Sequence, residues 1–180
     1  RLVGYLFANS HLSVTSSLEN WGVQISFMNP CGLRADVMPV AEGKVTFGSV
    51  FAAQPFGNML VTKTMSGKQI KSLLEQQFAD PNAIRILSPS AGFRFGYDLS
   101  RPLGQRVLFA TLNGAALDDT KPYRVTASDF LFNGGDAFSV FKEGSEPMVG
   151  IADLEALIAH LSRGGLTALP SLNRIEKKEP

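Results

Sequence analysis

The sequence pattern that decides the fold runs over residues 123–138 and reads YRVTASDFLFNGGDAF. In its first part, 123–128, apolar and polar side chains alternate, which predicts a half-buried strand. The glycine pair at 134–135 then breaks the pattern, and we expect a short helix to begin at Asp136. The stretch therefore predicts a strand that runs into a glycine-bearing loop with Phe130 and Asp136 on it.

Helical and strand patterns alternate along the rest of the chain. Ser66 followed by Gln69 is typical of a capping box, with apolar residues behind it at helical spacing. An Asn-Gly pair at 113–114 indicates a turn. We expect helices at 2–18, 46–53, 67–78 and 151–161, and strands at 23–28, 59–65, 84–88, 92–99, 106–112 and 123–128. This order of elements predicts an α+β domain whose middle part is a sheet.

The composition indicates one folded domain. With 180 residues, 44% of them hydrophobic and 18% charged, the chain can bury a core of ordinary size. We expect the domain at residues 1–170 and an unstructured tail at 171–180, which ends in Glu-Lys-Lys-Glu-Pro. The net charge of +1 offers no electropositive surface for polymeric nucleic acid. No apolar run long enough for a membrane span is present, and because the chain begins with Arg1 we expect it to be a piece of a longer protein.

Three loops combine glycine with polar or aromatic side chains beside a predicted strand, at residues 29–34, 55–58 and 129–136. Glycine allows positive backbone torsions and the close approach of a ligand. Two Phe rings can sandwich a nucleobase, an Asp can accept hydrogen bonds from ribose hydroxyls, and an Arg can hold a phosphate through two hydrogen bonds. The side chains with this chemistry are Arg34, Phe56, Phe130 and Asp136.

Each of these side chains also has a purely structural interpretation. Phe56 and Phe130 could belong to the core. Asp136 could be the N-cap of a helix, Arg34 an ordinary surface side chain and Asn29 a turn former. Composition and spacing alone leave both interpretations open.

Three motifs resemble the C-terminal domain of the family of 5′-nucleotidases, UDP-sugar hydrolases and 2′,3′-cyclic phosphodiesterases. Residues 29–36 (NPCGLRAD) are similar to the family's Asn-x-Gly-Gly-x-Arg segment, and residues 54–61 (QPFGNMLV) to its Pro-Phe-Gly-Asn strand. Residues 123–138 resemble its signature ending in Gly-Gly-Asp-Gly-Phe. The motifs occur in the family's order, and the likeness extends from about Gly4 to the closing helix. The resemblance implies an α+β fold with a mixed β-sheet flanked by helices.

For individual residues, the resemblance implies a nucleotide clamp. Phe56 and Phe130 would stack on the two faces of the base, and Asp136 would bind the ribose hydroxyls. Arg34 and Asn29 would contact phosphate or reacting-centre oxygens. Asn58 would line the base pocket.

Three positions depart from the family pattern. Cys31 stands where the family usually has Gly, which would reshape the turn that carries Arg34. Ala137 replaces the usual third Gly of the signature. Tyr5 replaces the Asn of the family's Gly-Asn-Leu helix start.

The residues that hydrolysis requires are not found in this sequence. A two-metal phosphohydrolase needs several Asp, His and Asn ligands, whereas the chain has only His11 and His160, outside any Asp-x-His or Gly-Asn-His-Glu motif. We expect both to be packing or surface residues. No Gly-x-Ser-x-Gly elbow is present, and Cys31 has no His partner at a suitable spacing. We therefore expect no catalytic residue, metal site or bound cofactor in this chain. The resemblance implies two divalent metal ions in an N-terminal metallophosphoesterase domain of the same parent protein.

These expectations lead to the hypothesis of a recognition domain. The parent would be a hydrolase of phosphoric esters that releases phosphate from nucleotides, and this chain alone would be inactive. Two alternatives remain open: a non-catalytic module that binds nucleotides or nucleosides, or a parent that acts on UDP-sugars or 2′,3′-cyclic nucleotides, because a Phe clamp distinguishes bases poorly. The family implies a periplasmic or extracellular location.

Overall fold

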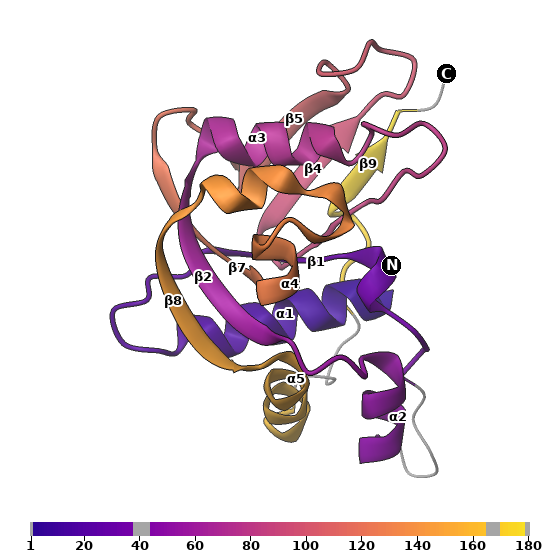
Figure 1. The fold of residues 1–180 in the computed structure, drawn as a ribbon, viewed down its shortest axis with the longest axis vertical. Coiled ribbons are helices and arrows are strands. Elements are labelled where there is room, and N and C mark those ends of the chain that lie inside the picture. The colour runs from indigo at the N-terminus through magenta and orange to yellow at the C-terminus, as the bar shows by residue number, and fades with distance from the viewer. Residues whose placement is uncertain (1, 38–43, 165–169, 179–180) are drawn as a thin grey trace.

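The fold contains two mixed β-sheets with helices packed around them (Figure 1). The computed structural model describes residues 2–37, 44–164 and 170–178. Its α-helices are α1 (Leu2–Ser16), α2 (Phe47–Ala53), α3 (Gly67–Gln76), α4 (Asp129–Phe132) and α5 (Asp153–Ser162). Its strands are β1 (Ile25–Met28), β2 (Met59–Ser66), β3 (Ser88–Pro89), β4 (Phe93–Tyr97), β5 (Val107–Leu112), β6 (Ala115–Ala116), β7 (Pro122–Ser128), β8 (Ser145–Ala152) and β9 (Ile175–Lys177). Short 3₁₀ helices are η1 (Pro30–Gly32), η3 (Gly135–Ala137) and η4 (Ser139–Glu143).

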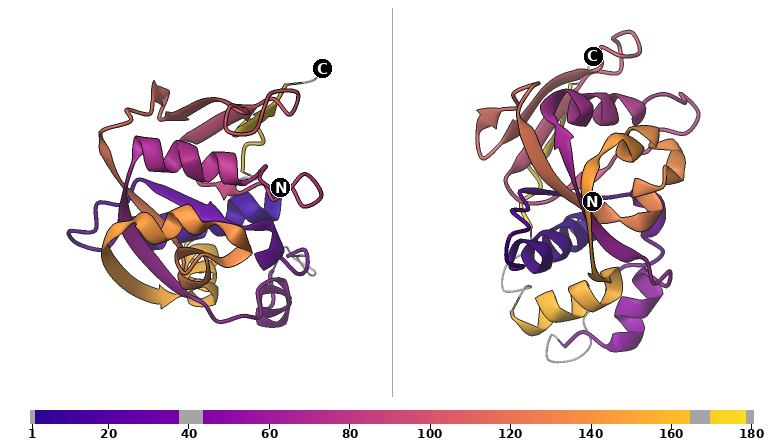
Figure 2. Two further views of the ribbon diagram at one scale, coloured as in Figure 1. Left: turned by 45° about the horizontal axis from the view of Figure 1, so that its top comes forward. Right: turned by 60° about the vertical axis from the view of Figure 1, so that its left-hand side comes forward.

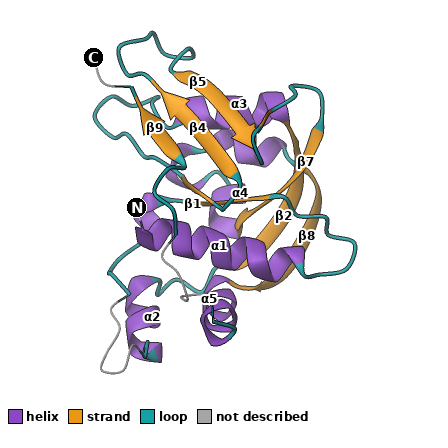
Figure 3. Ribbon diagram, turned by 180° about the vertical axis from the view of Figure 1, so that it is seen from behind, coloured by secondary structure: helices purple, strands orange, loops and turns teal. Residues whose placement is uncertain are grey.

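The larger sheet has the strand order β3-β1-β7-β2-β8, and the smaller one has the order β6-β5-β4-β9. Each sheet contains one parallel pair, β1 with β7 and β4 with β9, and the other neighbours are antiparallel. The smaller sheet and α3 lie at one end of the molecule, and α2 and α5 lie at the other (Figure 2). Seen from behind, α1 runs across the larger sheet (Figure 3).

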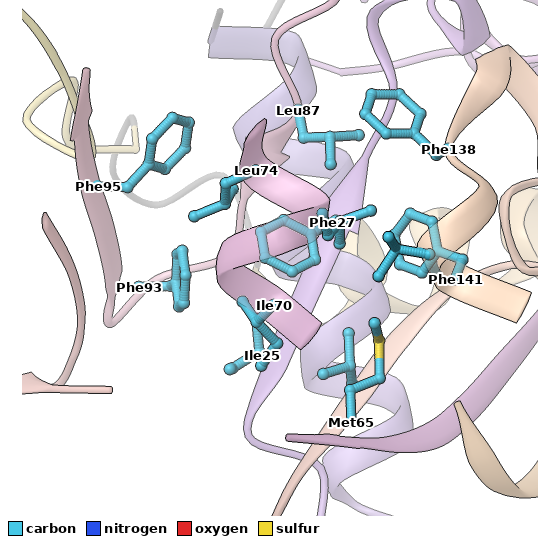
Figure 4. Close-up of a cluster of buried hydrophobic side chains, with 14 of the residues drawn as sticks. Ile25, Phe27, Met65, Ile70, Leu74, Leu87, Phe93, Phe95, Phe138 and Phe141 are labelled. Atoms are coloured by element: carbon cyan, nitrogen blue, oxygen red, sulfur yellow. The ribbon is translucent and has the colours of Figure 1, made fainter. Parts of the chain in front are cut away.

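The two faces of the larger sheet pack against different partners, because side chains alternate along each strand. On β1, Ile25 and Phe27 face the main core, which also takes in α3 and the smaller sheet (Figure 4). Met28 faces the other way and packs with residues of α1, α2 and α5. Within the main core the rings of Phe27 and Phe93 meet edge to face with 5.2 Å between centroids, an arrangement that aromatic pairs favour. Strand β1, inside the larger sheet, is thus buried on both faces.

The structure confirms most of the predicted elements. The helix behind Ser66 begins with the expected capping box, in which Ser66 Oγ accepts from the Gln69 backbone N–H and the Gln69 side chain accepts from the Ser66 N–H. The mixed arrangement of strands and flanking helices agrees with the predicted fold class, with two sheets in place of one. In the predicted strand at 84–88 only Ser88 is in a strand, so that prediction is largely wrong.

Near the C-terminus the predicted closing helix is confirmed with a later start, and the prediction of an unstructured tail is wrong. The closing helix begins at Asp153, because residues 145–152 form the unpredicted strand β8, which contains Pro147 and lies at a sheet edge, where proline is tolerated. The predicted unstructured tail contains β9, which pairs with β4. Ile175 is buried there, and Arg174 lies over the Tyr5 ring at 4.7 Å and donates to the Pro89 carbonyl.

The expectation that His11 is a packing residue is confirmed. The side chain is fully buried on α1, and neither ring nitrogen has a hydrogen-bond partner. Burial without a partner lowers the pKa of His11 to about 3, because an apolar environment disfavours the charged imidazolium. The folded protein therefore keeps His11 neutral at pH values where the unfolded chain binds a proton.

We predict that His11 lowers the stability of the folded protein as the pH falls below the ordinary His pKa of about 6.5. Between that value and about 3 the unfolded state holds one more proton at His11 than the folded state, so this residue contributes a slope approaching 1.4 kcal/mol per pH unit. Urea unfolding at pH 7, 6 and 5 measures the slope for the wild type and for His11→Leu. The variant should lack this contribution, and identical slopes for the two proteins would contradict the prediction.

Candidate functional site

The three glycine-bearing loops meet at one edge of the larger sheet. Because β1 and β7 are parallel, with Ser26 opposite Thr126, their carboxyl ends lie at the same edge. Strand β2 is antiparallel to β7, with Leu60 opposite Ser128, so its beginning lies at that edge too. The loops that follow β1 and β7 and the loop that precedes β2 are therefore neighbours.

All six predicted binding residues line one pocket of about 160 Å³ between these loops. The lining consists of Asn29, Cys31, Gly32, Arg34, Phe56, Asn58, Phe130 and Asp136. Sequence reasoning named Cys31 only as a departure from a pattern and did not name Gly32 as a lining residue. What the pocket binds is left as a prediction.

Neither Phe of the pocket belongs to the core. The exposed fraction is 46% for Phe56 and 44% for Phe130, which removes the structural interpretation of these rings. The Arg34 guanidinium lies over the Phe56 ring at 5.0 Å from its centroid, a distance at which a cation is attracted to the ring face. Arg34 is exposed and directed at the pocket by this contact.

Asp136 is held in an unusual backbone conformation. Its φ is 54°, in the left-handed region that non-glycine residues seldom occupy. It is not a helix N-cap, since Gly134 has that position in η3. The Asn29 side chain, only 4% exposed, donates from Nδ2 to Asp136 Oδ2 over 2.7 Å. Asn29 is thus more than a turn former, because it fixes one carboxylate oxygen of Asp136.

The position of the Phe130 ring depends on Gly135. A Cβ on Gly135 would lie 2.4 Å from the Phe130 ring, well inside van der Waals contact. Phe130 is the second residue of helix α4, whose N-cap Ser128 accepts a hydrogen bond from the Leu131 N–H. The cap and the missing side chain at Gly135 together determine where the ring lies.

Comparison with known proteins identifies the family. The profile of the family described as "5′-nucleotidase, C-terminal domain" matches residues 3–143. This chain belongs to that family. The match covers all three loops of the pocket, so the resemblance inferred from the motifs is confirmed.

Solved structures and curated relatives agree with this membership. The 5′-nucleotidase precursor of Thermus thermophilus superposes on 99% of the chain with a TM-score of 0.83 and 33% identity, and the chain covers 36% of that protein. The trifunctional nucleotide phosphoesterase protein YfkN of Bacillus subtilis is 33% identical over 86% of the chain, which spans 11% of its length. A cell wall protein of Listeria monocytogenes is 30% identical over 77% of the chain, which spans 18% of it. This chain therefore spans only a minor part of the length of each of these relatives.

The described part of the chain holds no group of three or more His, Cys, Asp or Glu side chains arranged to bind a metal ion. Within the same residues, no helix has the length and apolar character needed to cross a membrane. The lining of the pocket includes phenyl rings, amides, a carboxylate and a guanidinium group, which can stack, hydrogen-bond and make charge contacts.

We predict that Gly135→Ala displaces the Phe130 ring from the pocket with little loss of stability, because the ring is half exposed and can rotate outward. The measurement is the shift of the Phe130 ring signals in a ¹H–¹³C NMR spectrum. The control is Gly48→Ala, since a Cβ at Gly48 would meet nothing within 4 Å. Unmoved Phe130 signals in Gly135→Ala would refute the steric account.

Proposed function

We propose that the chain is the nucleotide-recognition domain of a 5′-nucleotidase-type phosphoesterase. The observation that supports this best is the single pocket in which two exposed Phe rings, an Arg, two Asn and an Asp converge. These groups match the three parts of a nucleotide, namely the base, the ribose and the phosphate. Residues 1–170 would form the recognition domain.

In this proposal Phe56 and Phe130 hold the base between their rings, and Asn58 lines the base pocket. The rings come from different loops and line the same pocket, which supports a site that takes a flat ligand between them. Stacking of this kind is worth roughly 1–3 kcal/mol per base and accepts any base. Such tolerance fits a family whose relatives bear names as different as apyrase and NAD 5′-nucleotidase.

The polar side of the pocket is assigned to the sugar and phosphate. Asp136 would accept hydrogen bonds from the ribose hydroxyls through the oxygen that Asn29 leaves free. Arg34 would bind the phosphate, because its guanidinium is exposed beside the base site and carries several donors. For Asn29, the bond to Asp136 supports a role in orienting the ribose contact, while a direct contact with phosphate stays a prediction.

Hydrolysis would take place in a part of the parent protein outside this chain. We assign it to an N-terminal metallophosphoesterase domain with two divalent metal ions, which would polarise the phosphoryl oxygens and activate water. The relatives are all much longer than this chain, which supports such a partner domain. A periplasmic or extracellular location is proposed, in keeping with the relative named as a cell wall protein.

We predict that the chain binds adenosine and that Phe130→Ala weakens binding by about 5- to 150-fold, the loss of roughly 1–3 kcal/mol of stacking. Isothermal titration calorimetry measures both dissociation constants. The matched control is Phe47→Ala, because Phe47 is also exposed, at 65%, but does not line the pocket. Equal affinities for wild type and Phe130→Ala would exclude the clamp.

We also predict that the chain releases no phosphate from AMP in the presence of Mg²⁺ or Mn²⁺. The reason is that the pocket supplies recognition groups and no set of metal ligands among the described residues. A colorimetric phosphate assay at high protein concentration tests this. Release above background that Asp136→Ala abolishes would place catalysis in this chain and overturn the assignment.

A further inference from the structure

The loop that carries Phe56 and Asn58 has little to hold it in place by itself. It connects α2 to β2, and Pro55, Phe56 and Gly57 are all exposed. Gly57 has a φ of 64°, so the backbone turns sharply there. A ring that must stack on a base needs a defined position, and this loop must obtain it from its two ends.

Both ends of the loop are bonded to one residue, Asp153, the first residue of α5. At the front end, Gln54 Nε2 donates to Asp153 Oδ2 over 2.6 Å. At the far end, the Asp153 backbone N–H donates to the Asn58 carbonyl over 2.9 Å. Asp153 and Gln54 are buried, with 0% and 1% exposed. The connection is therefore made out of contact with solvent.

Burial and hydrogen bonding have opposite effects on the pKa of the Asp153 carboxyl group. Burial raises the pKa of Asp153 to about 6, while hydrogen bonds from the Leu154 N–H and the Asn58 side chain act in the opposite direction. The charge on Asp129, at the start of α4, adds to the rise.

Helices α1 and α2 and strand β8 pack against α5. On α1, His11 stays neutral because its pKa is about 3. Helix α2 carries no titratable side chain. Glu155 and His160 belong to α5 itself, and Glu146 lies on β8.

We propose that Asp153 is a positioning residue for base recognition: it holds both ends of the loop at 54–58, so that Phe56 and Asn58 face the base. The inference rests on the proposed function, since it concerns the same pocket. It adds a residue that touches no ligand and that lies beyond residues 3–143, the part matched by the family profile.

The ionised form of Asp153 is the one that holds the loop. A carboxylate offers two acceptor oxygens, which here accept from the Leu154 N–H and from the Gln54 amide. Protonation converts one of these oxygens into a donor, which weakens one of the two bonds. Base affinity should therefore fall as the pH drops through the Asp153 pKa.

The experiment measures adenosine affinity by calorimetry from pH 5 to pH 8. A nucleoside is the right probe because a phosphate ester titrates near pH 6 and would obscure the effect. For the wild type we expect about a 3- to 10-fold weaker affinity at pH 5 than at pH 8. Asp153→Ala, which removes the carboxyl group that holds the Gln54 end of the loop, should weaken binding about 10-fold at pH 8.

Two further variants separate positioning from general stability. Asp153→Asn keeps the shape but, like the protonated acid, offers one carbonyl oxygen in place of two carboxylate oxygens. It should therefore bind adenosine as weakly as the wild type does at pH 5, with an affinity independent of pH. Asp98→Asn is the matched control, because Asp98 is another buried carboxylate, hydrogen-bonded to Ser100 and absent from the pocket. It should keep the wild-type affinity and pH profile.

The outcomes distinguish this inference from the proposed function. If the wild type binds adenosine but Asp153→Ala binds equally well, or Asp153→Asn keeps the wild-type pH profile, the positioning role is wrong and the proposed function stands. If the wild type binds no adenosine, the proposed function is wrong. The positioning role of Asp153 is then tested by NMR on the ligand-free protein. The Gly57 amide signal should then titrate near pH 6 in the wild type and not in Asp153→Asn, and a signal that does not titrate would overturn the inference.

Discussion

The parallel pairing of β1 with β7 is the constraint on which the pocket depends. In a fully antiparallel sheet the loops after these two strands would lie at opposite edges, and Asn29 would be far from Asp136. Their 2.7 Å hydrogen bond exists because both strands end at the same edge. The register is fixed by burial on both faces, since a slip of one residue would turn Val125 and Ile25 out of the main core.

The sequence predicted the pocket better than it predicted the sheet. The loops could be found because glycine, aromatic and charged residues occur together where a strand pattern stops, and because the order of the motifs matched a family. The strands that it missed have weak local signals. Strand β8 contains Pro147 and a left-handed Glu146, and β9 is a three-residue strand in a charged segment. Their pairing comes from tertiary contacts such as Ile175 in the core, which no local pattern reveals.

Strain at the pocket is compensated by contacts around it. Asp136 and Ala137 both have positive φ, at 54° and 66°, and such residues persist only where their surroundings hold them. On one side Asn29 binds the Asp136 carboxylate. On the other, the next residue, Phe138, is buried and packs against Phe141. Ala137, which departs from the usual glycine, is tolerated in this conformation because the residues before and after it are anchored.

The rings of Phe130 and Phe56 are positioned in different ways. Phe130 is placed by short-range features, the N-cap Ser128 and the vacant space at Gly135. Phe56 stands on a loop whose ends are bonded to the start of α5, some hundred residues further along the chain. The position of a base held between these rings would therefore depend on how α5 packs against the sheet as well as on the local turns. A buried carboxyl group with a pKa of about 6 at that junction makes the position of the Phe56 ring responsive to protons.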